Sequence, residues 1–342
     1  MPAAAAEESQ SWKQGVPKSI QVVTATPQFL TFKYERTPYV KAKVTFTFPE
    51  NYPAVPLIVT LEQLPPGLIK KLMREMEDVA KAHLSKPQIQ PVAQHLTNFL
   101  DTNWFVPCWK ELRKIVDQAK DSNTLSIGSL QETKGAIRFQ LTNGEYAYEG
   151  KMMVNPGYPS TTNLDDPLQL QTMKSNFPKH VLEMVVEKQV KNFLRNMQDG
   201  MKQENAWLKG NPIKHPDQPA DTPNDGDPIP SLLPLVSILQ TKLQALPATN
   251  CPMCQTPVLP KDPKQLAKLK KPHQPTYSSC GCWYHHQCLD QSLSEPPFGE
   301  SCPACRRNAY HPDWASDEKE RQQAYAQKQA RQREMDDVAD MF

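Results

Sequence analysis

The chain has 342 residues, with 39 lysines and arginines against 37 aspartates and glutamates. Because a single hydrophobic core stops growing well before this length, we expect two or three domains. The near balance of charge gives no general attraction for nucleic acid, and no apolar run approaches the roughly 18 residues that cross a bilayer. The start, Met1-Pro2-Ala3, leads into Glu7 and Glu8 without the basic and apolar stretches of a secretion signal. We therefore expect a protein of the cytoplasm, the nucleus or both, with no membrane partner.

The first predicted domain, residues 15–120, has strands followed by helices. Between Val40 and Phe48, apolar residues alternate with lysine and threonine, which is the pattern of a half-buried strand. After a proline-rich turn, the apolar run at 57–61 predicts another strand. Helical spacing then relates Leu68, Ile69, Leu72, Met73, Met76, Val79 and Ala80.

The second predicted domain, residues 122–208, repeats this order more weakly. Ile137, Phe139 and Leu141 alternate with polar residues up to Asn143-Gly144, a pair typical of a tight hairpin turn. A long helix is predicted from Leu182, Val185, Val186, Gln189, Phe193, Leu194 and Met197. The two domains together predict an α+β fold with two lobes of one design.

Residues 209–232 are predicted to be a linker, because 211–230 hold six prolines and few apolar groups. We expect this stretch to tether a small cysteine-rich module at residues 248–312. The remaining segment, 315–342, is rich in charge and glutamine without glycine or proline, which predicts a solvated helix or a frayed extension.

Seven of the eight cysteines lie between residues 251 and 305, in close pairs with histidines among them. A disulfide scaffold does not suit a chain without a secretion signal, whereas cysteine pairs with interleaved histidine suit zinc. A spacing of two residues lets both thiolates of a knuckle face one tetrahedral ion, so each pair is half of a site. We therefore predict two structural zinc ions, whose ligands are Cys251, Cys254, Cys280, Cys282, His285, Cys288, Cys302 and Cys305.

Among the histidines, His285 is preferred because two residues separate it from Cys288, as in the cysteine knuckles. His286 is the alternative, and His273 is a more remote one. Such a small segment has little core of its own, so metal binding must supply most of its folding free energy.

Two resemblances extend these predictions. The strands, the Tyr52-Pro53 turn, the next strand and the helices are similar to the pattern of RWD domains, and Tyr158-Pro159 occupies the same place in the second lobe. RWD lobes without a catalytic cysteine usually recruit protein partners, so the resemblance implies that the lobes bind a substrate or a scaffold. Cys108, between Pro107 and Trp109, lacks the surroundings of a conjugating-enzyme nucleophile and is predicted to be a small core residue.

The order of ligand pairs resembles the RING finger, in which the first and third pairs share one zinc and the second and fourth share the other. This cross-brace implies one site of Cys251, Cys254, His285 and Cys288 and a second site of Cys280, Cys282, Cys302 and Cys305. RING proteins generally dock a ubiquitin-loaded conjugating enzyme and use no nucleophile of their own. The matching contact positions are Met253, Pro303 and Leu293, and Arg306 is the candidate that bridges conjugating enzyme and ubiquitin.

The RING resemblance implies a ubiquitin ligase with a conjugating enzyme, ubiquitin and a protein substrate as partners. Its architecture is similar to the double-RWD and RING part of Fanconi anaemia core complex ligase subunits. Ser292 stands where active RING fingers often have tryptophan, which leaves a non-catalytic adaptor as the first alternative. The second alternative is a histone-tail reader of the PHD type, which normally has four or five residues before its histidine ligand.

Overall fold

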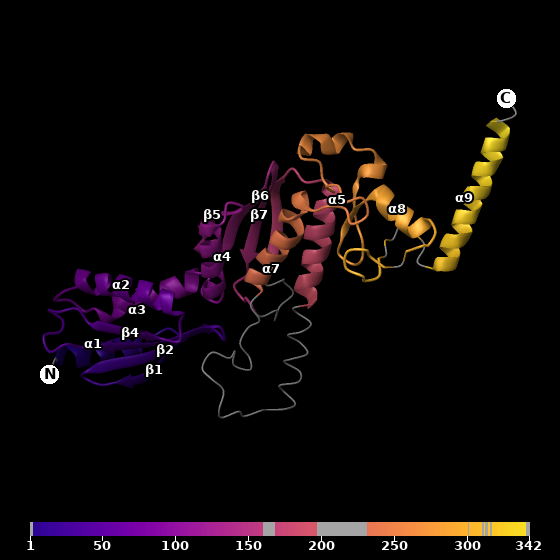
Figure 1. Ribbon diagram of the computed structural model, residues 1–342. Helices are drawn as coiled ribbons and strands as arrows, with labels where there is room; N and C mark the ends of the chain where they lie inside the picture. The colour runs from indigo at the N-terminus through magenta and orange to yellow at the C-terminus, as the bar shows by residue number, and fades with distance from the viewer. Residues whose placement is uncertain are drawn as a thin grey trace.

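A computed structural model describes residues 3–159, 168–196, 231–299, 301–309, 311, 314 and 317–339 (Figure 1). Within these residues lie two four-stranded antiparallel sheets, each with helices packed on it, and one two-stranded sheet in the cysteine-rich module. The predicted α+β class is therefore confirmed. In the described part of the chain, no helix has the length and apolar character needed to span a membrane.

The first lobe contains a sheet with the strand order β1-β2-β3-β4. Its strands are Ile20–Ala25 (β1), Phe29–Thr37 (β2), Val40–Thr47 (β3) and Ile58–Glu62 (β4). Val44 and Phe46 of β3 are buried while Lys43 is not, as the alternation predicted. Val44 pairs with Phe32 on one side and with Leu61 on the other, so one face of the sheet is apolar.

Three helices belong to this lobe: α1 (Ala3–Gln14), α2 (Pro66–Ala82) and α3 (Ile89–Thr102). Helix α2 begins at Pro66, where a missing N–H costs nothing because the first turn has no acceptor for it. Leu68, Leu72 and Met76 of α2 are buried at the predicted helical spacing. The helices therefore cover the apolar face of the sheet and close the first core.

The second lobe has the strand order β5-β6-β7-β8. Its strands are Leu125–Gln131 (β5), Ala136–Asn143 (β6), Tyr146–Val154 (β7) and Leu168–Ser175 (β8), with the short helix η1 at Glu132–Lys134. The predicted hairpin joins β6 to β7: Asn143 pairs with Tyr146, and Gly144 has a φ of 58°, which suits glycine. The predicted long helix is described from residue 179 to 196, and Met197 lies outside the described residues.

The boundary between the two hydrophobic cores lies earlier in the chain than the predicted domain boundary at residues 120–122. Three helical segments are concerned: α4 (Trp109–Asp121), α7 (Leu232–Leu239) and η3 (Gln240–Gln244). Leu112 and Ile115 of α4 are buried in the core of the second sheet, and so are Leu235 and Leu239 of α7. The sequence analysis placed α4 in the first domain. An amphipathic helix between two sheets can pack on either of them, and α4 packs on the second. The second lobe therefore begins with α4 and also includes α7.

A buried carboxylate joins three elements of the first lobe. Glu8 of α1 accepts hydrogen bonds from the hydroxyl of Tyr52 and from the backbone N–H of Ile89, the latter at 2.6 Å. Tyr52 belongs to the proline turn after β3, and Ile89 is the first residue of α3. Burial raises the pKa of Glu8, while these hydrogen bonds oppose the rise. The carboxylate therefore ties α1 and the turn to the start of α3, where a negative charge is favourable.

The second lobe repeats this arrangement with Glu111 of α4. Its two carboxylate oxygens accept hydrogen bonds from the Tyr158 hydroxyl at 2.7 Å and from the backbone N–H of Leu233 at 2.9 Å. Ser231, just before α7, donates its N–H to the Tyr158 hydroxyl at 3.1 Å. Burial raises the pKa of Glu111 as well. In this duplicated arrangement α4 corresponds to α1 and α7 corresponds to α3.

This correspondence changes the place of the predicted linker. Most of residues 209–232 lie outside the described residues, but Ser231 and Leu232 already belong to the start of α7. Because α7 completes the second lobe, the proline-rich stretch connects two helices of one lobe. A short helix was predicted at residues 235–246, between the linker and the module; α7 and η3 occupy this place and pack in the core of the second lobe.

The cysteine-rich module packs on the second lobe (Figure 1). Asn143 donates its side-chain amide to the carbonyl of Gln244 at 2.9 Å, and the Tyr146 hydroxyl donates to the carbonyl of Pro260 at 2.8 Å. The ring Nε2 of His180 lies 3.0 Å from the carbonyl of Pro275. One continuous hydrophobic core includes residues of both parts. The module is therefore held in one orientation on this lobe.

The predicted tail forms helix α9, Glu318–Ala339, most of which is exposed. It contacts the preceding module through Tyr325, whose ring meets that of Phe298 edge to face at 5.8 Å. Figure 1 shows α9 extending away from the rest of the protein.

Candidate metal centre

The first cysteine pair, Cys251 and Cys254, lies in a tight turn. The N–H of Gln255 donates to the carbonyl of Cys251 at 2.9 Å, and the N–H of Cys251 donates to the carbonyl of Thr256 at 2.8 Å. Gln255 has a φ of 60°, a left-handed conformation that turns the chain sharply after the second cysteine. Both thiols are thereby held on one side of the turn.

The last pair, Cys302 and Cys305, forms a turn of the same design. The N–H of Arg306 donates to the carbonyl of Cys302 at 2.8 Å, and the N–H of Cys302 donates to the carbonyl of Arg307 at 2.8 Å. Arg306 has a φ of 58° and occupies the position of Gln255 in the first turn. The module therefore contains two equivalent knuckles, one near each end.

Short regular elements position the middle ligands. They are β9 (Pro275–Tyr277), β10 (Trp283–His285) and α8 (His286–Ser294). Cys280 and Cys282 lie in the turn between β9 and β10, on either side of Gly281, whose φ of 94° suits glycine. His285 ends β10, and Cys288 lies in the first turn of α8. A hairpin and a helix start thus present these four side chains.

The structure gathers the eight predicted ligands into two groups. One group is Cys251, Cys254, His285 and Cys288, and the other is Cys280, Cys282, Cys302 and Cys305. In each group the ligand atoms lie within 4.8 Å of one another. Four ligands around a tetrahedral zinc at bond lengths of about 2.3 Å are about 3.8 Å apart, so both groups can hold a zinc ion. The first and third pairs along the chain share one group, and the second and fourth share the other.

His285 is oriented for metal binding through its Nδ1. This atom lies 3.3 Å from the Sγ of Cys254 and 3.9 Å from the Sγ of Cys288. Its Nε2 lies 3.0 Å from the carbonyl of Pro257, an arrangement that places the proton on Nε2 and leaves the Nδ1 lone pair free for a metal. His286, the alternative ligand, packs against Trp314 with ring centroids 5.1 Å apart.

Charge in each group favours a cation. Partial burial raises the pKa of Cys254, but hydrogen bonds from Thr256 and His285 outweigh it and lower the pKa to about 6. A backbone hydrogen bond from Arg307 lowers the pKa of Cys305 to about 6 as well. Burial and the nearby thiols instead raise the pKa of Cys288 to about 12. Each group thus holds one thiol that loses its proton readily, and a positive ion among the thiols would favour the loss of protons from the others.

Some residues that support the ligands were missed by the sequence analysis. The Tyr284 hydroxyl donates to the Sγ of Cys302 at 2.7 Å, and the Thr256 hydroxyl lies 3.1 Å from the Sγ of Cys254. Such hydrogen bonds fix ligand orientation and thiolate character. Thr256 lies two residues after the predicted ligand Cys254, so the sequence offers a signal for this contact. Tyr284 is 18 residues from Cys302 in the sequence, and only folding brings the two together.

The predicted conjugating-enzyme contacts have different surroundings. Met253 is 41% exposed, and Pro303 and Arg306 are exposed on the second knuckle. Leu293 is only 1% exposed and belongs to the hydrophobic core, so the prediction that it contacts a conjugating enzyme is wrong. It faces inward because α8 buries Leu289 and Leu293, four residues apart, on one side. Neighbouring Ser292 is partly exposed.

Cys108 is a core residue, as its sequence context predicted. It is 1% exposed, its Sγ lies 3.6 Å from the carbonyl of Phe105, and burial strongly raises its pKa. A thiol in this state supplies almost no thiolate near neutral pH. A thioester role for Cys108 therefore has no support in its surroundings.

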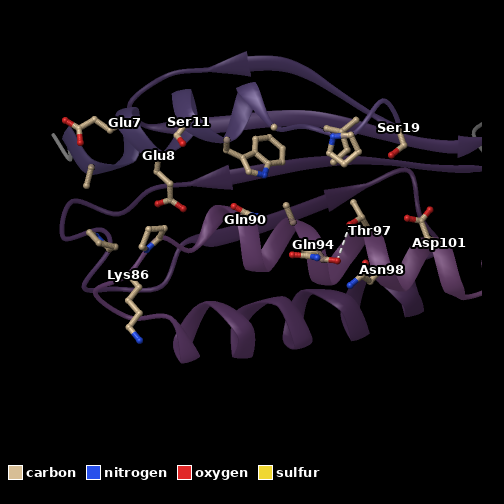
Figure 2. A pocket seen from close by; sticks show the side chains of 18 of the residues that line it. Glu7, Glu8, Ser11, Ser19, Lys86, Gln90, Gln94, Thr97, Asn98 and Asp101 are labelled. Carbon is tan, nitrogen blue, oxygen red and sulfur yellow. Dashed lines mark hydrogen bonds between the residues drawn. The ribbon is translucent and has the colours of Figure 1, made fainter.

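The first lobe also carries a large polar hollow between α1 and α3, of about 850 Å³. Figure 2 shows Gln90, Gln94, Thr97 and Asp101 following one another along α3 at its border. The carboxylate of Asp101 accepts a hydrogen bond from Tyr34, and Glu8 is occupied by Tyr52 and Ile89, as described above. Two of the hollow's carboxylates thus already have structural partners.

Comparison with known proteins identifies part of this architecture. Residues 6–100 match the RWD domain family. No curated protein matches the chain. The first lobe is therefore an RWD domain, a kind of domain associated with protein interaction and the ubiquitin pathway, and it stands in one chain with two groups that can hold zinc.

Proposed function

We propose that the protein is a RING-type ubiquitin ligase with two structural zinc ions. The observation that carries this proposal is the crossed pairing of the ligand groups, in which the first and third pairs lie together and the second and fourth lie together. Crossed pairs hold the two knuckles in a fixed relation, which suits a rigid docking surface. The RWD domain, with its association with the ubiquitin pathway, supports the same conclusion.

Each zinc would have a closed shell of four protein ligands, so its contribution is rigidity. Catalysis then consists of positioning: the knuckles present Met253 and Pro303 to a conjugating enzyme, and Arg306 donates hydrogen bonds to the conjugating enzyme and ubiquitin together. The forked guanidinium suits this bridge because it offers several donors in one plane. Holding ubiquitin in one conformation next to a substrate lysine accelerates transfer without a nucleophile from this chain.

The lobes supply the substrate in this proposal. Because the cysteine-rich module packs on the second lobe through His180, Tyr146 and Asn143, a protein bound to the second lobe stays at a fixed distance from the knuckles. The overall plan resembles that of Fanconi anaemia core complex ligase subunits. The protein-binding role of the lobes makes the substrate a protein.

An in vitro ubiquitination assay with a panel of conjugating enzymes tests the ligase activity. Arg306→Gly is a sharp variant, because a φ of 58° favours glycine and the knuckle should keep its fold. We expect at least a tenfold lower rate with unchanged zinc content. Gln255→Gly makes the same backbone change in the first knuckle and should leave the rate unchanged.

A protein with full zinc content that builds no ubiquitin conjugates with any conjugating enzyme would overturn the ligase proposal. Equal rates for Arg306→Gly and the unchanged protein would overturn only the bridging role. A non-catalytic adaptor is the second candidate, favoured by Ser292 in place of an aromatic residue and by the buried Leu293. The same assay separates an adaptor from a ligase.

A further inference from the structure

A second concave surface of the first lobe, which we call the edge groove, runs between β4 and α2. Its volume is about 580 Å³. One wall is Pro56, Leu57, Ile58 and Val59, and the other is Pro66, Ile69, Lys70, Met73, Arg74 and Glu77. The two walls come from consecutive elements, because α2 starts four residues after β4 ends and packs alongside it. The edge groove is separate from the cysteine-rich module.

The β4 wall is the free edge of a sheet. The strand order ends at β4, so within the described residues no strand pairs with the side of β4 that faces away from β3. A free edge offers backbone N–H and C=O groups to another chain, and proteins usually protect such edges with charged residues or prolines. Pro56 precedes β4 and the charged Glu62 ends it, but between them Ile58 is 57% exposed.

The α2 wall offers apolar contacts over the length of a short strand. Ile69 and Met73 lie one turn apart, and Met73 is 36% exposed. From Pro66 to Glu77 the helix rises about 17 Å, which matches about five residues of extended chain. A strand added to β4 would direct alternate side chains toward Ile69 and Met73.

The charge of the edge groove is positive. Lys70 and Arg74 lie one turn apart on its wall, and among the described residues neither forms an ion pair. The acidic residue of the wall, Glu77, is paired with Lys81 at 2.8 Å. An occupant that carries carboxylates beside its apolar residues would complement these two cations.

We propose that the edge groove binds an extended segment of a partner protein, with alternating apolar and acidic residues, as a fifth strand beside β4. Backbone hydrogen bonds supply affinity, the apolar side chains pack on Ile69 and Met73, and the carboxylates meet Lys70 and Arg74. A second copy of this chain is a poorer occupant, because pairing two β4 edges would add a second pair of these cations to the same surface.

Fluorescence anisotropy with the full-length protein tests this site. The probes are three labelled nonapeptides that alternate glutamate with valine, leucine or phenylalanine, and the comparison peptides carry lysine instead of glutamate. We expect saturable binding of at least one acidic peptide, weakened by salt, and none of the lysine peptides. The double variant Lys70→Glu/Arg74→Glu should lower the affinity at least about tenfold, since it replaces attraction by repulsion at two positions.

Lys13→Glu/Lys18→Glu is the matched control, because it makes the same charge change at exposed residues that do not line the edge groove. Its affinity should equal that of the unchanged protein. Hydrogen exchange provides the second measurement: bound peptide should protect backbone amides of residues 58–62. Protection there distinguishes strand addition from a contact of charged side chains alone.

The proposal is overturned if no acidic peptide binds more tightly than about 1 mM. It is also overturned if the Lys70→Glu/Arg74→Glu variant binds normally or if amides of β4 gain no protection. Dimerisation of the free protein that this variant alters would instead make a second copy the occupant. No ubiquitin enzymes are present in these measurements, so their failure leaves the proposed ligase function untouched.

Discussion

Replacing Glu111 by alanine should weaken the attachment of α7 to the second lobe. The carboxylate accepts hydrogen bonds from the Tyr158 hydroxyl at 2.7 Å and from the Leu233 N–H at 2.9 Å, at the amino end of α7. Each hydrogen bond to a charged group contributes about 1.5–3 kcal/mol, and a negative charge at a helix start adds about 0.3–1 kcal/mol. Burial of the carboxylate, which raises its pKa, offsets part of this. We expect the opening free energy of α7 to fall by about 3 kcal/mol.

Native-state hydrogen exchange measures this change directly. A fall of that size is roughly a 150-fold faster exchange of the α7 amides in the regime where exchange reports the opening equilibrium. The duplicated fold offers the matched control, Glu8→Ala, which should expose the amides of α3 and leave those of α7 protected. If the α7 amides keep their protection in Glu111→Ala, or if α3 and α7 lose protection equally, this carboxylate does not hold α7 on the second lobe.

Three further outcomes are expected. His285→Ala should lower the zinc content from two ions per chain to one, measured by elemental analysis, while His286→Ala keeps both; zinc loss in His286→Ala would contradict the ligand choice. Leu293→Ala should destabilise the cysteine-rich module by about 2–5 kcal/mol through a cavity, seen as faster exchange of α8 amides, and an unchanged exchange with weaker conjugating-enzyme binding would restore its docking role. Because burial raises the folded-state pKa of Glu8 above its ordinary 4.5, its protonation stabilises the first lobe below that pH, and this stability is lost as pH rises through the folded-state pKa. Glu8→Gln should remove this pH dependence from α3 exchange, and a slope that persists would assign it to another group.

The edge groove and the cysteine-rich module are proposed to bind different proteins. The groove belongs to the RWD domain, whereas the module that carries the knuckles shares its hydrophobic core with the second lobe. Since the module packs on that lobe, a conjugating enzyme held by the knuckles would have a fixed position relative to the second lobe. The two proposed sites use different residues, so the two proposed functions do not compete for one surface.

Local sequence determined those features that depend on neighbours along the chain. Alternation in β3, helical spacing in α2 and the Asn143-Gly144 turn each follow from side-chain periodicity or from the conformation that glycine allows. The ligand pairs are equally local, because a two-residue gap places both thiols of a knuckle on one side of a turn. These elements were correctly predicted from the residues themselves.

Only the tertiary structure decided which of these elements pack against one another. The apolar spacing of an amphipathic helix such as α4 does not show which sheet the helix will cover. The sequence around Leu293 likewise does not show whether its side chain faces a partner protein or the core of its own module. Glu111, Tyr158 and Ser231 are far apart in the sequence, and their contact arises because folding brings buried polar groups together where they can satisfy one another. The sequence by itself thus determined the local elements and the residues of the two groups that can hold zinc, whereas packing assigned α4 and α7 to the second lobe and oriented His285 toward the cysteines of its group.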